Sequence, residues 1–95
     1  MADKDAYIQK LHAKIDEWNA EIDKLKAKAD QAEADARADY SEELENLKKK
    51  RREAEKKMDE VRKASEGAWE DLKAGAQSAM DAMEAAVKSA KSRFS

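Results

Sequence analysis

The feature that most constrains this chain is a row of apolar residues spaced alternately three and four positions apart over residues 8–36. The row consists of Ile8, Leu11, Ile15, Trp18, Ile22, Leu25, Ala29, Ala32 and Ala36. An α-helix turns once in about 3.6 residues, so this spacing places the whole row on one helical face. Because the pattern continues for four heptads without an error, it predicts a coiled coil rather than an ordinary surface helix.

The residue types within this apolar seam favour self-association. Its isoleucines occupy heptad position a, while its leucines and Trp18 occupy position d, a combination that favours two strands in parallel coiled coils. The flanking charges allow both orientations, because Glu21 can face Lys26 in a parallel pair or Lys28 in an antiparallel pair. The predicted partner is therefore another copy of the chain, as a dimer or tetramer, with the orientation and the number of chains left open.

The heptad pattern extends over residues 4–64, with a stutter near residues 36–44 where the spacing becomes four, four, three. Arg51 occupies a position where a core residue is expected, and its long stem can lie along the seam while the charge stays in water. The predicted oligomer core consists of Ile8, Leu11, Ile15, Trp18, Ile22, Leu25, Leu44, Leu47, Met58 and Val61.

The apolar period changes to eleven residues in the C-terminal part. The stripe formed by this repeat contains Trp69, Leu72, Met80, Met83, Val87 and Phe94. Eleven residues make three helical turns, so the stripe runs almost parallel to the helix axis and is about 100° wide. This pattern predicts an amphipathic helix over residues 68–94.

Together these patterns predict a single all-α domain over residues 1–95. There is no proline and there are only two glycines, so the chain has few of the residues that β-hairpins and long loops need. The long heptad helix and the C-terminal helix are expected to pack as a hairpin or as an oligomeric helical bundle. A turn is expected near Ser65–Gly67, with Gly67 in the left-handed C′ position, or near Asp39–Ser41, where capping residues occur.

Charge is strongly segregated along the chain. Residues 1–47 carry 7 Lys and Arg against 13 Asp and Glu, whereas residues 48–63 carry 9 against 4. Such blocks favour pairing, within one chain or between chains. We interpret the basic run Lys48–Arg52 as a solvated face that pairs with the acidic N-terminal half. Nucleic-acid binding is disfavoured, because acids interrupt the basic patch and no aromatic residue lies within it.

Residues for catalysis or metal binding are scarce. His12 is the only histidine and lies beside the apolar seam, and there is no cysteine. Neighbouring acids on a helix diverge by about 100°, so they do not converge on a proton or a metal. The sequence therefore predicts neither an enzyme nor a bound cofactor or metal. The first residues lack the apolar core of a signal peptide and no run of about 18 apolar residues occurs, so a cytoplasmic location is expected.

Two stretches carry a resemblance to known proteins: YIQKLHAKIDEWNAEIDKLKAKADQAEADAR near the start, and AWEDLKAG with KSAKSRF near the end. With them, the whole chain resembles small, cysteine-free bacterial coiled-coil proteins that are often described as stress-response proteins. The resemblance implies a small cytosolic helical protein and supplies no functional residues. The eleven-residue step is also similar to the repeats of apolipoproteins and desiccation-tolerance proteins.

The predicted function is that of a non-enzymatic structural or interaction protein, related to stress, that self-associates through its coiled coil. The alternative is a peripheral protein that binds membrane surfaces or partly unfolded proteins through the 68–94 stripe. Acidic and basic residues are balanced on that segment, so an anionic lipid surface would gain no net attraction from it.

Overall fold

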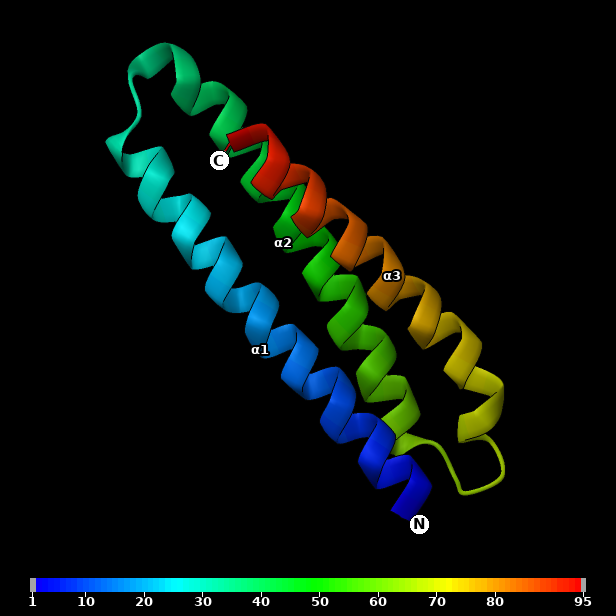
Figure 1. Ribbon diagram of the computed structural model, residues 1–95. Helices are drawn as coiled ribbons and strands as arrows, with labels where there is room; N and C mark the ends of the chain where they lie inside the picture. The colour runs from blue at the N-terminus through cyan, green and yellow to red at the C-terminus, as the bar shows by residue number, and fades with distance from the viewer. Residues whose placement is uncertain (1, 95) are drawn as a thin grey trace.

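This computed structural model describes residues 2–94 of the chain. These residues form three helices joined by two turns and contain no strand. The helices are α1 (Ala2–Gln31), α2 (Ala34–Lys63) and α3 (Trp69–Phe94). The chain reverses twice, so α1 and α3 run in the same direction and α2 runs opposite to both (Figure 1). The resulting bundle measures 51 × 19 × 17 Å. The prediction of an all-α helical bundle is confirmed.

The central helix in the packing is α2. It lies closely against both α1 and α3, whereas α1 and α3 meet only sparsely. The apolar rows of all three helices converge on one core, in which Ala54, Val61 and Met83 are completely buried. Each Leu, Ile or Met side chain that is fully buried in this way contributes about 1.5–3 kcal/mol of transfer free energy.

The residues predicted to form an oligomer core lie in the core of the single chain. Eight of them are buried there, namely Leu11, Ile15, Trp18, Ile22, Leu25, Leu44, Leu47 and Val61. Ile8 and Met58 are partly buried and pack against the same core. The apolar seam is therefore covered largely by the chain's own helices.

The heptad segment of residues 4–64 is divided into α1 and α2 at Ala32–Glu33, a position that was not among the two turns expected from the sequence. Glu33 is extended, with φ −70° and ψ 160°, and its carbonyl accepts the first backbone hydrogen bonds of α2. The side chain of Arg37 reaches back, donating from Nε to the Ala32 carbonyl at 2.9 Å and from Nη2 to the Asp30 carbonyl at 3.5 Å.

Arg37 therefore supplies hydrogen bonds to carbonyls at the end of α1 that have no partner within the helix. Glycine in a left-handed conformation commonly helps to satisfy such carbonyls, and no residue near this turn is a glycine. The alternative turn near Asp39–Ser41 is not formed, because these residues lie within α2.

The second reversal does lie near Ser65–Gly67, between the end of α2 and the start of α3. Its mechanism differs from the prediction, because no described glycine has a positive φ. Ala64 is extended instead, and the Ser65 carbonyl accepts hydrogen bonds from the N–H groups of Ala68 and Trp69, both at 3.1 Å. Lys4 of α1 donates from its ammonium group to the Ala64 carbonyl, which ties the start of α1 to this turn.

An aromatic pair joins the helices at each end of the bundle. Tyr7 of α1 and Trp69 of α3 lie with ring centroids 5.9 Å apart, and the Lys73 ammonium sits over both rings. At the opposite end, Tyr40 of α2 stacks on Phe94 of α3 with centroids 4.2 Å apart. These pairs fix the position of both ends of α3.

Candidate functional site

A groove opens between α1 and α3, and we define this α1–α3 groove as the surface between residues 10–28 of α1 and residues 77–94 of α3. Three cavities lie along it. Neighbouring cavities share residues of their walls: Trp18 belongs to two of them and Val87 to another two. The three cavities therefore form one continuous groove.

The groove exists because α1 presents polar side chains to α3. One heptad row of α1 makes these contacts: the Tyr7 hydroxyl donates to the Lys73 carbonyl, Lys14 pairs with Glu84, Glu21 pairs with Lys91, and Lys28 donates to the Phe94 carbonyl. Long charged side chains bridge the two helices at their tips. The two helices meet only sparsely, and small cavities remain between them above apolar residues that are themselves almost fully buried.

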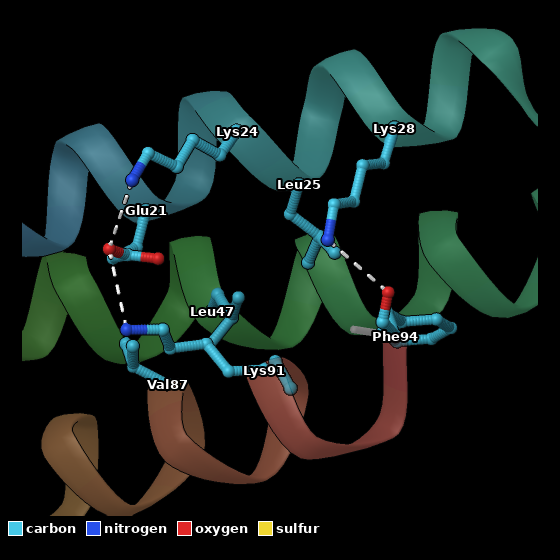
Figure 2. A pocket seen from close by; sticks show the side chains of 9 residues that line it. Glu21, Lys24, Leu25, Lys28, Leu47, Val87, Lys91 and Phe94 are labelled. Carbon is cyan, nitrogen blue, oxygen red and sulfur yellow. Dashed lines mark hydrogen bonds and ion pairs between the residues drawn. The ribbon is translucent and has the colours of Figure 1, made fainter.

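The cavity at the C-terminal end of α3 has an apolar floor and a charged rim (Figure 2). It has a volume of about 240 Å³, and its floor includes Leu25 of α1, Leu47 of α2, and Val87 and Phe94 of α3. All three helices therefore contribute to one apolar surface. Leu47 forms its deepest part, because this residue is almost completely buried.

The mouth of this cavity is positively charged. Lys24 and Lys91 share one oxygen of Glu21, with ammonium-to-oxygen distances of 3.7 and 3.5 Å. Lys28 donates to the carbonyl of Phe94 at 3.4 Å (Figure 2) and makes no ion pair with a residue of the described part, 2–94. The lining of this cavity thus contains three lysines and one glutamate, which leaves an excess of positive charge beside the apolar floor.

The middle of the groove has a similar apolar wall but a balanced charge, because three lysines and three glutamates line it. A cavity of about 350 Å³ is lined by Trp18, Ala20 and Val87, with Lys14 and Lys88 at its edges. Lys14 is shared between the carboxylates of Glu17 and Glu84, whereas Lys88 makes no ion pair or hydrogen bond with any described residue. This part of the groove also combines an apolar wall with an ammonium group that has no partner.

The predicted 68–94 stripe is mostly turned into the bundle. Trp69, Met80, Met83 and Val87 are buried, and Phe94 is partly buried against the core. Leu72 is the exception, with 37% of its surface exposed. The structure thus brings residues of the two predicted sets together in the groove: Trp18 and Leu25 from the apolar seam, and Met80, Val87 and Phe94 from the stripe.

The charged residues of the groove were not predicted as site residues. Glu21 and Lys28 were recognised only as residues that flank the apolar seam, and Lys91 follows Met80 by eleven positions. The heptad spacing and the eleven-residue spacing indicate that these charged residues lie beside apolar positions of their own helices. They do not show that Glu21 faces Lys91, because that depends on where the chain turns.

The predicted pairing of the basic run with the acidic N-terminal half is not formed within the chain. Arg51 donates to Asn19 of α1 at 2.8 Å and lies 4.0 Å from Glu55 of its own helix. The other four basic residues of Lys48–Arg52 make no ion pair or hydrogen bond with a described residue. The acids of α1 that form ion pairs do so with residues of α1 or α3.

Neither a metal cluster nor a membrane-spanning helix is found in residues 2–94. No three His, Asp or Glu side chains of this part come together in a way that could hold a metal ion. His12 lies on the exposed face of α1, with its Nδ1 atom 3.3 Å from Asp16. None of the helices has the length and apolar character needed to cross a membrane.

Comparisons with protein-family models, curated proteins and solved structures found no match to this chain. The resemblance to bacterial coiled-coil proteins therefore stays a prediction from the sequence, and the function has to be inferred from the groove itself.

Proposed function

We propose that the chain is a non-enzymatic interaction protein that binds an amphipathic helix in its α1–α3 groove. The observation that carries this proposal is a surface cavity between the parallel helices α1 and α3, whose floor includes the almost fully buried side chains of Leu25, Leu47 and Val87. A helix that lies in such a groove buries apolar side chains at every third or fourth position, as in other helix-in-groove complexes.

The length and charge of the groove define the partner. Residues 10–28 of α1 extend over about 27 Å, which corresponds to five helical turns. The excess of positive charge at Lys24, Lys28 and Lys91, together with the unpaired Lys88, favours acidic residues along the edges of the partner helix. The proposed ligand is therefore an amphipathic helix with an apolar stripe and acidic flanks, such as a partly unfolded protein can expose.

This proposal keeps the predicted class of function and changes the surface that performs it. Binding through the whole apolar seam or the whole 68–94 stripe requires the bundle to open, because most of those side chains are packed in its core. The groove uses only the edges of both sets, such as Leu25 and Val87, which line the cavity at the C-terminal end of α3. Binding in the groove requires no such opening. A helical ligand would complete a four-helix arrangement around Leu47.

The test uses the folded chain and a synthetic helical peptide of about 20 residues with leucine at its core positions and glutamate at its flanks. We expect the peptide to shift the amide NMR signals of residues 10–28 and 77–94. A control peptide with lysine in place of glutamate should bind more weakly. Failure of both peptides to bind at millimolar concentration, or equal binding of the two, would contradict the proposal.

A matched pair of variants locates the binding surface. Lys88→Glu reverses an unpaired charge in the groove, and Lys26→Glu reverses an unpaired charge on α1 that lies outside the three cavities. We expect Lys88→Glu to weaken binding of the acidic peptide by roughly threefold or more, since one exposed ion pair contributes about 0.2–1 kcal/mol. Equal effects of the two variants would place the peptide elsewhere.

A further inference from the structure

A row of four exposed residues on α2 has no partner within the chain. Asp35, Glu42, Lys49 and Lys56 are spaced seven positions apart, so they occupy the same heptad position along the helix. Each is exposed, and none makes an ion pair or hydrogen bond with a described residue. We call these four residues the outward row of α2. Two acids occupy its first half and two bases its second half.

The outward row faces away from the rest of the bundle. Arg51 contacts Asn19 of α1 on one flank of α2, and Glu43 contacts Arg93 of α3 at 3.5 Å on the other flank. Lys49 lies about 200° around the helix from Leu47, which is buried against the other two helices. The row is therefore on the opposite side of α2 from the α1–α3 groove.

The segments of the chain that contain the outward row are also acidic in the first half and basic in the second half. Residues 33–45 contain six acids and a single base, Arg37, whereas residues 48–57 contain seven bases and two acids, Glu53 and Glu55. The net charges of these segments are equal in size and opposite in sign. Since the two segments are consecutive on α2, they cannot fold onto each other. Arg93 of α3 pairs with Asp39 and Glu43 of the acidic segment, and Lys57 pairs with Glu60. The four residues of the outward row keep no such partner among the described residues.

We propose that a second copy of the chain packs antiparallel against the outward face of α2. With a two-fold axis between Glu45 and Asn46, Glu42 lies opposite Lys49 of the second copy and Asp35 lies opposite Lys56. Each contact occurs twice, as required in a closed two-fold dimer. A parallel pair in the same register would place like charges opposite each other.

A second copy fits this surface better than a polyanion does. Nucleic acid or anionic lipid would be attracted by the basic half but repelled by Asp35 and Glu42 on the same face. The second copy supplies a complementary charge to both halves. Because exposed ion pairs are individually weak, we expect a salt-dependent dimer that forms only at about millimolar protein concentration.

The test measures self-association of the full chain by sedimentation equilibrium at about 10 mM and about 1 M salt, between which the Debye length falls from about 30 to about 3 Å. We expect a dimer at low salt that dissociates at high salt. Glu42→Lys and Lys49→Glu should each weaken dimerisation by about tenfold or more, since each variant places like charges opposite each other twice.

The double variant Glu42→Lys with Lys49→Glu should restore the dimer to within about threefold of the original chain, because the two opposite charges have only exchanged places. Circular dichroism checks that all variants keep their helices. The proposal is overturned by a monomer at low salt and millimolar concentration, by a double variant no better than the singles, or by a dimer that survives high salt. Peptide binding in the groove is scored separately with Lys88→Glu, so either proposal can fail alone.

Discussion

At the scale of single residues, Tyr7 shows how one side chain joins two helices by several kinds of contact. Its ring packs beside Trp69, its hydroxyl donates to the Lys73 carbonyl at 3.3 Å, and the Lys73 ammonium lies over the ring. Burial raises the pKa of the Tyr7 hydroxyl above its ordinary value of 10.0, and the charge of Asp81 raises this pKa further. The neutral phenol is therefore the form that the folded state favours.

This preference predicts a loss of stability in alkali. Between pH 10 and the pKa of Tyr7 in the folded state, the unfolded chain has lost the phenolic proton and the folded chain still holds it, so the free energy of unfolding falls as pH rises. Urea unfolding measured from pH 9 to 12 should show this fall, and Tyr7→Phe should make it less steep. An identical slope in the original chain and the variant would contradict the assignment, whatever the difference between their absolute stabilities.

At the scale of elements, the turn between α1 and α2 depends on a side chain rather than on a special backbone conformation. Arg37 lies in the first turn of α2 and donates to the Ala32 and Asp30 carbonyls at the end of α1. The guanidinium group is rigid and has several N–H groups, so it can bind two carbonyls at once. The reversal is thereby stabilised by a residue that follows it.

We expect Arg37→Ala to lower the free energy of unfolding by about 0.5–1.5 kcal/mol, the usual net contribution of a hydrogen bond. Arg52→Ala is the matched control, because Arg52 is an exposed arginine of the same helix that makes no hydrogen bond or ion pair with a described residue. Chemical denaturation of both variants measures the difference. If both changes cost the same, the contacts of Arg37 do not stabilise the turn.

The elements also show what the sequence could and could not predict. Leu11, Ile15 and Ile22 were expected on one helical face and are buried, because spacing alone decides which residues share a face. Spacing does not decide which helix covers that face, and here it is covered within the same chain. The turn at Ala32–Glu33 was missed because no glycine or proline marks it.

The turn at Ala32–Glu33, which was not predicted, also decides which residues meet in the groove. The reversal at Ala32–Glu33 sets how α1 lies against α2, and the second turn then brings α3 alongside α1. Only this arrangement places Glu21 next to Lys91 and Lys28 next to Phe94. These contacts join positions about 70 residues apart in the sequence, so no local pattern contained them.

At the scale of the whole molecule, the apolar rows of the three helices bury one another within a single chain. The core includes residues from all three helices and lies inside a bundle only 19 × 17 Å across. A coiled coil of separate chains, by contrast, would complete its core only on association. The two arrangements differ in how stability depends on protein concentration.

We therefore expect the midpoint of thermal unfolding to be independent of protein concentration from about 1 to 100 μM in high salt, where the proposed α2 contact is screened. A core shared between chains would raise the midpoint with concentration, because association would then be linked to folding. Differential scanning calorimetry over this range distinguishes the two. A steady upward shift would show that the apolar seam is shared between copies.

The odd number of helices has a mechanical consequence. Residues 2 and 94 lie at opposite ends of the 51 Å bundle, because α1 and α3 run in the same direction (Figure 1). Tension applied between these two points acts along the helix axes, so it slides α1 and α3 past α2 and loads the whole length of both interfaces at once. A bundle with an even number of helices would instead be peeled open from one end. Under such tension, α2 would transmit the load between its two neighbours.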